Sequence, residues 1–177
     1  MNEDHQHYRP PRRMRLVGAL VGSAMLAAAS PAFANDLAGP ELWGGFAQNA
    51  KIVQLGEFNV ASLSQHDLGQ YARVVQDGFG NQVDGWQGNG HGNHLRVGQH
   101  GHYNSAMVSQ EGSNHLVTLE QHGEANVANI AQYGDGRTAS IEQFGNHNRL
   151  DLVQGPASPH IALRQHGDNN VASLVQY

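Results

Sequence analysis

Glutamine recurs along the chain at a nearly constant spacing, and its side-chain amide is both a hydrogen-bond donor and an acceptor. The spacing is eleven residues, with one step of twelve between Gln87 and Gln99. Five residues after every other glutamine stands an asparagine, whereas the intervening units have varied residues at that position. The complete repeat is therefore two units long, about 22 residues, and it occurs six times. A buried amide is costly unless it is paired, but amides stacked at equivalent positions can donate to one neighbour and accept from the other. The pattern therefore predicts ladders of amides along a stack. The predicted ladder residues are Gln54, Asn59, Gln65, Gln76, Asn81, Gln87, Gln99, Asn104, Gln110, Gln121, Asn126, Gln132, Gln143, Asn148, Gln154, Gln165, Asn170 and Gln176.

The residues between these amides alternate in character, as they do in a β-strand, where successive side chains point to opposite faces. Between Asn126 and Gln132 the inward positions are Ala128 and Ile130. The position of Ile130 is aliphatic in every unit except one, where it is Gly85, and we expect valine there to speed assembly. Helical periodicity is absent from this region. Four-residue segments with a glycine near their second position separate the strands and predict tight turns.

Two strands and two turns make one coil, and stacked coils place equivalent strands side by side at about 4.8 Å. The predicted fold class is all-β, a β-solenoid (β-helix) of six two-strand coils that form two parallel in-register sheets, as in amyloid. The interior is expected to be very narrow, because a small residue lies beside an aliphatic one in most strands. The predicted solenoid covers residues 48–177, with repeats at 48–69, 70–92, 93–114, 115–136, 137–158 and 159–177.

The N-terminal part is predicted to be a secretion signal rather than part of the fold. Four arginines precede an apolar run from Leu16 to Ala29, and Ala32-Phe33-Ala34 has the form of a cleavage site. We expect residues 1–34 to be removed after Ala34, leaving a soluble exported protein with no membrane span, although Met14 is an alternative start. Residues 35–47 contain no repeat and are predicted to be a flexible segment. The remaining chain has six basic and thirteen acidic residues and no basic stripe for nucleic acid.

The tandem pattern Q-x-G-x-x-N-x-A-x-x-x-Q resembles the curlin repeat of bacterial curli fibre subunits. Full matches begin at Gln54, Gln99, Gln121 and Gln165, and two further copies have Val83 or Leu150 in place of the alanine. The resemblance implies a secreted subunit that polymerises with itself into extracellular amyloid fibres for adhesion and biofilm matrix. It also implies another curlin subunit and a dedicated outer-membrane secretion machinery as partners. The intact last repeat and the ending Val-Gln-Tyr resemble a major subunit, and the alternative is a minor subunit that nucleates fibres.

The chain departs from the curlin pattern at the first-strand position where many curlins have serine. We expect these departures to weaken the ladder there, and a proline also lacks a backbone donor. The residues at this position are Gln48, Gln70, Asn93, His115, Arg137 and Pro159.

A secreted β-helix enzyme that acts on polysaccharide is the rival from another functional class. It is disfavoured because the outward charges are expected to be scattered, with no paired carboxylate and partner base. An ice-binding solenoid would need a regular outward array of threonines, which the sequence lacks. We therefore predict no catalytic residue and no cofactor.

Twelve histidines raise the question of a metal site, and several of them follow a ladder glutamine. His100 and His122 occupy equivalent places in adjacent coils, close enough to share a metal ion. No carboxylate ligand is evident beside them, and Phe144 interrupts the series. A role in the turns is therefore favoured, and no metal site is predicted. The chain has no cysteine, which excludes disulfides and thiolate metal sites.

Overall fold

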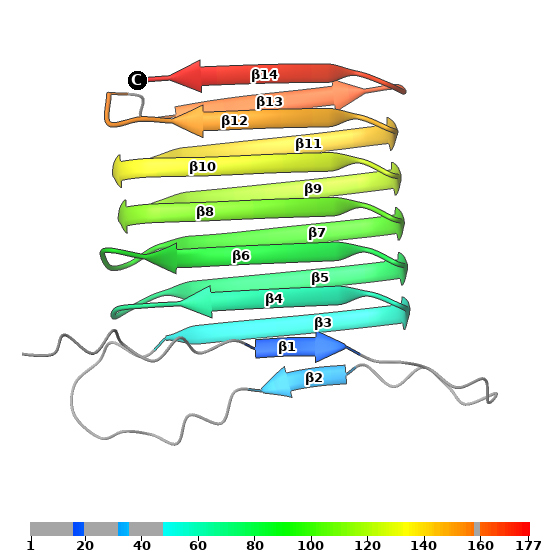
Figure 1. The fold of residues 1–177 in the computed structure, drawn as a ribbon, viewed down its shortest axis with the longest axis horizontal. Coiled ribbons are helices and arrows are strands. Elements are labelled where there is room, and N and C mark those ends of the chain that lie inside the picture. The colour runs from blue at the N-terminus through cyan, green and yellow to red at the C-terminus, as the bar shows by residue number, and fades with distance from the viewer. Residues whose placement is uncertain (1–15, 20–31, 36–47, 158–159) are drawn as a thin grey trace, which may run out of the picture.

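The computed structural model of the protein describes residues 16–19, 32–35, 48–157 and 160–177, and these residues form strands and turns without a helix. Twelve strands, β3 to β14, build the six coils of a β-solenoid (Figure 1). The predicted fold class is therefore confirmed. The strands are β1 (Leu16–Ala19), β2 (Ala32–Asn35), β3 (Asn49–Glu57), β4 (Val60–Gln65), β5 (Tyr71–Phe79), β6 (Gln82–Gly88), β7 (His94–His102), β8 (Ser105–Ser113), β9 (Leu116–Glu124), β10 (Val127–Asp135), β11 (Thr138–Asn146), β12 (Arg149–Gln154), β13 (His160–His166) and β14 (Val171–Gln176).

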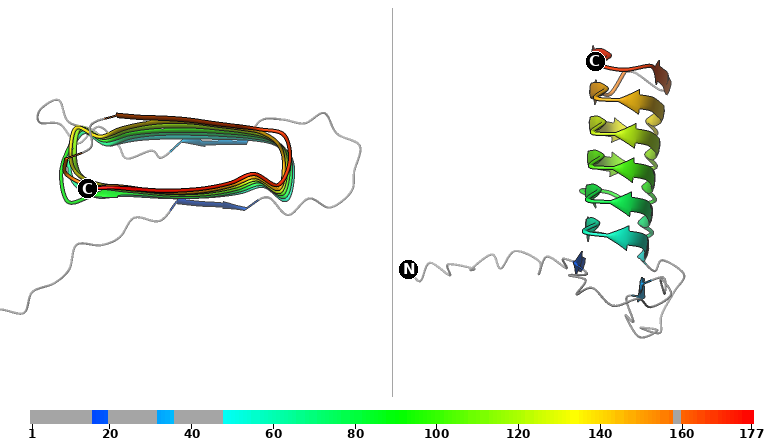
Figure 2. Two further views of the ribbon diagram at one scale, coloured as in Figure 1. Left: turned by 90° about the horizontal axis from the view of Figure 1, so that it is seen from above. Right: turned by 90° about the vertical axis from the view of Figure 1, so that its right-hand side faces the viewer.

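The strands divide into two sheets that face each other. One sheet has the order β4-β6-β8-β10-β12-β14 and the other the order β3-β5-β7-β9-β11-β13, and all of these neighbours are parallel. The register places each glutamine beside the equivalent glutamine of the next coil, as with Gln99 and Gln121. Seen along the stack, the coils superimpose on one flattened outline (Figure 2). Equivalent side chains therefore form columns along the axis.

Alternate residues of each strand fill the narrow interior, as their period of two requires. Leu119, Ile141 and Leu152 are at most 1% exposed, and small residues such as Ala128 are fully buried beside them. In the last coil the equivalent Leu163 and Leu174 are only partly buried. The hydrophobic core is thus one continuous column that runs along the axis and becomes accessible at the C-terminal end.

The corners between paired strands depend on residues with positive φ. In the corner after Gln99, Gly101 has φ +111° and Tyr103 has φ +54°, and equivalent corners repeat this geometry. A Cβ atom on Gly101 would lie 2.2 Å from the carbonyl oxygen of Gly123 in the next coil, so only glycine permits this stacking distance. Because stacked corners continue the backbone hydrogen bonding, several strands extend through the glycine and are longer than the sequence pattern suggests.

The second and third coils show how the solenoid accommodates irregular residues. The extra residue of the longer repeat lies in the turn between β6 and β7, and the register on either side is preserved. Gly85 is surrounded closely, since an added Cβ would lie 2.7 Å from Leu63 Cδ2 and 2.8 Å from Leu95 Cδ2. Leu95 stands where β3, β5 and β11 have alanine, and it fills the space that Gly85 leaves. This filled space argues against the expectation that valine at Gly85 would speed assembly, which stays a prediction for experiment.

The short strands β1 and β2 pair antiparallel with β4 and β3, respectively, at the N-terminal end of the stack. These strands belong almost entirely to the predicted signal segment, whose other residues lie outside the described ranges. Most of the predicted flexible segment, residues 36–47, also lies outside them. The described part of the chain contains no helix of the length and apolarity needed to cross a lipid bilayer.

Candidate functional site

The glutamines form two continuous ladders inside the solenoid, one beside each sheet. In one ladder, the Nε2 atom of Gln76 donates to Oε1 of Gln99 at 2.9 Å, and Gln99 donates in turn to Gln121 at 2.8 Å. The same direction holds for every glutamine pair from Gln54 to Gln165, and for the second ladder from Gln65 to Gln154. Gln176 lies in register with Gln154 at the end of the second column. All these amides donate toward the C-terminal end of the stack.

From Gln65 to Gln165, the second proton of each ladder glutamine crosses to the opposite sheet. Gln121 Nε2 donates to the carbonyl oxygen of Ser105 at 3.1 Å, and Gln143 Nε2 donates to that of Val127 at 3.1 Å. The acceptor is in each case the first residue of the preceding strand. The glutamines therefore join neighbouring coils and also hold the two sheets together, while remaining almost completely buried.

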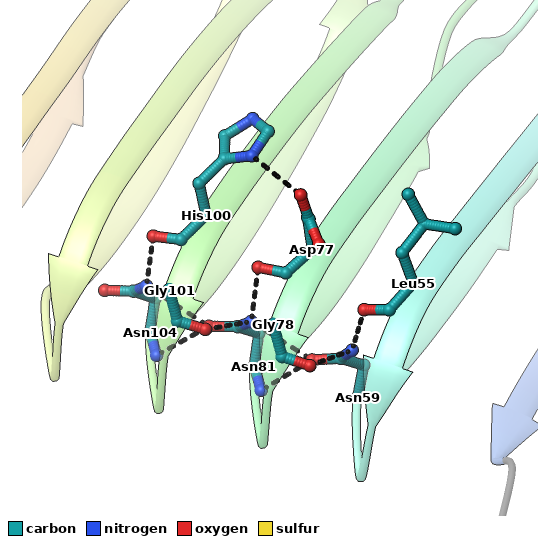
Figure 3. Close-up of polar contacts among 8 residues, drawn as sticks. All are labelled: Leu55, Asn59, Asp77, Gly78, Asn81, His100, Gly101 and Asn104. Carbon is teal, nitrogen blue, oxygen red and sulfur yellow. Dashed lines mark hydrogen bonds and ion pairs between the residues drawn. The ribbon is translucent and has the colours of Figure 1, made fainter. Parts of the chain in front are cut away.

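The asparagines form a third ladder, at the corners, with the opposite direction. Asn104 donates from both its backbone nitrogen and its Nδ2 to Oδ1 of Asn81, at 3.0 and 3.1 Å (Figure 3). Its Nδ2 also donates to the carbonyl oxygen of Gly123 in the following coil at 3.0 Å. Between side chains the asparagine amides thus donate toward the N-terminal end. Asn59, Asn81, Asn126, Asn148 and Asn170 occupy the same column.

The glycine and the asparagine of the motif therefore act on the same contact. The missing side chain of one glycine leaves room for the carbonyl group of the equivalent glycine in the next coil, and the asparagine of the first coil donates to this carbonyl. The spacing Q-x-G-x-x-N follows from this geometry, since the residues between them complete one corner. Replacing either residue would remove hydrogen bonds in two coils, because each asparagine contacts the coils on both sides.

The corner on the other side of the solenoid contains a fourth ladder, at the position where the sequence led us to expect a weakened one. Gln70 Oε1 accepts from the backbone nitrogen of Asn93 at 3.1 Å, Asn93 Oδ1 accepts from that of His115 at 2.9 Å, and His115 Nδ1 accepts from that of Arg137 at 3.2 Å. Glutamine, asparagine and histidine therefore perform the same task. The expectation that these departures weaken the ladder is wrong for these three residues. Arg137 continues the column by donating to the carbonyl oxygen of Pro156, and Gln48 donates to that of Asp67 at 2.7 Å, whereas Pro159 lies outside the described residues.

His115 occupies its ladder position as a neutral ring. Its side chain is 1% exposed, and its Nε2 lies 3.1 Å from the carbonyl oxygen of Glu111. Because Nδ1 accepts a hydrogen bond, the remaining proton belongs on Nε2, where it is donated to that carbonyl. Burial lowers the pKa of His115 below its ordinary value, although the hydrogen bond to Glu111 opposes this effect. A second proton would sit on Nδ1 and would face the backbone N–H of Arg137, so the ladder hydrogen bond requires the neutral ring.

The outward charges are less scattered than the sequence suggested. Lys51, Arg73 and Arg96 are in register on three adjacent strands and form one exposed row of cations. Further along the stack, Arg164 Nε lies 2.5 Å from Glu142 Oε2, and Arg149 Nε lies 2.8 Å from Asp151 Oδ2. The pKa of Asp151 is lowered by its hydrogen bonds from Arg149 and Asn129. The expectation of scattered charge is therefore wrong for the row of three cations.

Comparison with known proteins identifies the repeat that these ladders define. The family described as curlin associated repeat matches the chain twice, at residues 90–123 and 123–155. No curated protein and no solved structure matches the chain. The two matched segments lie within coils in which the amide ladders are unbroken. Residues 90–155 of the chain therefore contain curlin associated repeats.

Proposed function

We propose that this protein is a structural subunit of a secreted curli-type amyloid fibre, which grows as one solenoid stacks end to end on the next. The observation that carries this proposal is the accessible C-terminal coil. Ala172 and Leu174 are partly exposed there, whereas the equivalent Leu150 and Leu152 of the preceding coil are at most 1% exposed. Strands β13 and β14 are the last strands of their sheets, so their outer backbone groups face away from the stack. Such an edge favours pairing with another chain.

The two ends of the stack complement each other in hydrogen-bonding groups as well as in shape. At the C-terminal end, Gln165 Nε2 donates to the carbonyl oxygen of Asn170 at 3.3 Å in place of a next glutamine, and this proton would be donated onward in a longer stack, while Oδ1 of Asn170 can accept. At the N-terminal end, Gln54 offers Oε1, and Asn59 offers a backbone N–H and Nδ2. A second copy placed one coil beyond the first would continue both ladders with the directions seen inside the chain. Every junction of the fibre would then repeat an internal junction of the subunit.

Export is part of the proposal and rests on the sequence of the N-terminal segment. Cleavage after Ala34 would remove β1 and all but the last residue of β2. The edges of β3 and β4 would then be open to another copy. The dedicated outer-membrane machinery, the other curlin subunit, and the roles in adhesion and biofilm matrix follow from the family resemblance. A structural role is favoured over catalysis because the buried polar groups are engaged in ladders.

Within such a fibre we propose the role of the major subunit. In the last repeat, Gln165 and Asn170 keep the ladder hydrogen bonds to the preceding coil, and Gln176 is in register with Gln154. A subunit with two intact ends can bind a fibre through one end and accept the next subunit at the other, whereas a nucleator needs only one intact end. A seeding assay separates the roles. Bulk monomer of this protein should elongate on its own fragmented fibres without a lag, and a nucleator would instead shorten the lag of another curlin subunit while elongating poorly itself.

The experiment that tests fibre growth compares two substitutions in the last strand. Leu174→Asp places a charge on the inward side of the end coil, and Val175→Asp places the same charge on the outward side, where Val175 is 50% exposed. With the mature chain at neutral pH, thioflavin fluorescence, sedimentation and electron microscopy should show fibres for the unchanged protein and for Val175→Asp. Leu174→Asp should remain soluble, because a charge would be buried at each junction. The proposal is refuted if the unchanged chain stays monomeric and thioflavin-negative for days, or if Leu174→Asp assembles as readily as Val175→Asp.

A further inference from the structure

A column of aromatic rings lies on the outer face of one sheet, at the position that follows the ladder glutamine in β7, β9, β11 and β13. The rings of His100 and His122 are stacked with centroids 4.8 Å apart and an angle of 13° between their planes. Phe144 stacks on His122 at 4.7 Å, and His166 stacks on Phe144 at 5.0 Å. The parallel register of β7, β9, β11 and β13 maintains this column. Two imidazoles of neighbouring coils are therefore held side by side on the surface.

A carboxylate approaches this pair of histidines because a side chain is missing beside it. Gly98 is in register with Glu120, and a Cβ atom on Gly98 would lie 2.0 Å from Glu120 Oε2. The Glu120 carboxylate therefore lies over Gly98, in the space that another residue would fill, and this brings it toward His100. The neighbouring Glu142 is occupied by its ion pair with Arg164, whereas Glu120 has no ion-pair partner among the described residues. Glu120 is the carboxylate that the sequence did not reveal beside the histidines.

The three side chains have the composition and spacing of a metal site. One ligand atom each from His100, Glu120 and His122 lies within 4.8 Å of the other two, and all three side chains are half-buried. A point then exists within about 2.8 Å of all three atoms, and Zn–N or Zn–O bonds of about 2.0–2.2 Å require each ligand to move inward by less than about 1 Å. Because an imidazole nitrogen binds a metal in the plane of its ring, the two stacked rings must also turn about their side-chain bonds until their lone pairs converge, which their half-exposed positions permit. We propose that His100, Glu120 and His122 bind a divalent transition-metal ion, with Zn²⁺ as the best fit.

The surroundings of the three residues suit an ion of this class. Two imidazoles and one carboxylate are ligands that Zn²⁺ accepts, with a water molecule at a fourth, solvent-facing position. The carboxylate of Asp77 lies 3.8 Å from His100 Nδ1, as Figure 3 shows, and a carboxylate beside a ligand histidine orients the ring and raises its basicity. Arg73 and Arg96 border the same shallow depression as His100 and Glu120, and neither arginine forms an ion pair with a described residue. The bound ion would connect β7 and β9, and hence two successive coils, from outside.

The column itself provides a conservative way to remove the ligands. Phe144 shows that a phenyl ring stacks here as an imidazole does, so His122→Phe removes a ligand and keeps the stack. Glu120→Gln removes the carboxylate charge with little change in shape. His166→Phe is the matched control, because His166 belongs to the column and lies outside the three-residue cluster. Gly98→Ala keeps all three ligand residues in the sequence, but its Cβ displaces the Glu120 carboxylate from its position over residue 98.

The test is a Zn²⁺ titration of the assembled mature chain by isothermal calorimetry, with circular dichroism to verify that each variant keeps its β-structure. We expect one site per chain that is clearly stronger than background binding by the other histidines. His122→Phe, Glu120→Gln and Gly98→Ala should each weaken this site by at least about tenfold, the scale seen when even a supporting group of a metal site is removed. His166→Phe should leave it unchanged. Electron paramagnetic resonance of bound Cu²⁺ should show two nitrogen ligands, falling to one in His122→Phe. The proposal is overturned if the first three variants bind Zn²⁺ like the unchanged chain, or if His166→Phe loses as much affinity as they do.

Discussion

Exchanging volume between Gly85 and Leu95 gives the sharpest test of the solenoid interior. Gly85 is buried in β6, and Leu95 in β7 is fully buried beside it. Gly85→Val adds three carbon atoms at a place where even a single Cβ would lie 2.7 and 2.8 Å from leucine methyl groups. Leu95→Ala removes three carbon atoms from the other side of the same contact. The two changes together conserve the number of core carbons.

The expected magnitudes follow from these distances. Carbon atoms pack at about 3.5–4.0 Å, so Gly85→Val forces the two leucines to move by roughly 1 Å. Overpacking of this kind costs about 1–3 kcal/mol. The better strand propensity of valine offsets at most about 1 kcal/mol of this cost. Leu95→Ala alone should cost about 2–5 kcal/mol, because it leaves a cavity. The double variant should lie within about 1.5 kcal/mol of the unchanged chain, as volume-conserving exchanges do.

The assay is the concentration of soluble protein that remains in equilibrium with fibres, which rises tenfold for each 1.4 kcal/mol lost per added chain. Gly85→Val should raise it by up to about 150-fold, Leu95→Ala by about 30-fold or more, and the double variant by less than Leu95→Ala alone. Urea unfolding of any soluble folded chain should give the same order. The reasoning about the core is refuted if Gly85→Val assembles more completely than the unchanged chain, or if the two substitutions are additive.

Three further predictions concern the corners and ladders. Gly101→Ala should abolish assembly, because its Cβ would lie 2.2 Å from the Gly123 carbonyl oxygen. The control Gly136→Ala has nothing within 4 Å of the new Cβ and should cost only about 1–2 kcal/mol of backbone strain. The yield of fibres measures both effects. Asn126→Ala leaves several buried groups unpaired and should destabilise the fibre by about 3–5 kcal/mol, measured from the concentration of protein that stays soluble. The control Asn129→Ala removes one part-buried hydrogen bond to Asp151 and should cost less than about 1 kcal/mol. Equal effects of the two variants would contradict the role given to the asparagine ladder. Because the pKa of His115 is lowered in the folded chain, the unfolded chain takes up the proton first as the pH falls. The free energy of unfolding should therefore be highest above the ordinary histidine pKa of about 6.5, and it should decrease as the pH drops from there through the pKa of the folded chain. Denaturant midpoints between pH 5 and 7.5 should show a slope that His115→Asn reduces and that the exposed control His147→Asn leaves unchanged.

The sequence predicts the architecture well because the repeat makes each strand's position independent of distant contacts. Gln121 and Gln143 could be placed in one column from their spacing alone, since parallel stacking brings equivalent residues together. The inward positions followed from a period of two and are buried as expected, with Ile130 and Leu152 as examples. The direction of the ladders did not follow from spacing. It depends on which amide atom faces the next coil, and the asparagines at the corners face the opposite way from the glutamines.

The residues that the sequence did not reveal depend on differences between coils. His115 continues a ladder because one of its ring nitrogens can accept where asparagine offers an oxygen, and a comparison of residue types hides this equivalence. Glu120 reaches the histidines only because Gly98 stands beside it in the preceding coil. Gly85 looked like a defect because Leu95, which fills its space, lies in a different strand and a different coil. Such pairs become visible only when register and side-chain volume are known together.

The opposite directions of the glutamine and asparagine ladders have a consequence for symmetry. Two copies that met through the same end would bring donor to donor in one ladder and acceptor to acceptor in the other, so a two-fold dimer closed at the ends is disfavoured. The remaining contact joins unlike ends, and the flat coils add almost no rotation that could close a ring (Figure 2). An assembly of this kind has no size at which it is complete. The supply of chains, rather than the geometry of the subunit, then sets the length of the polymer.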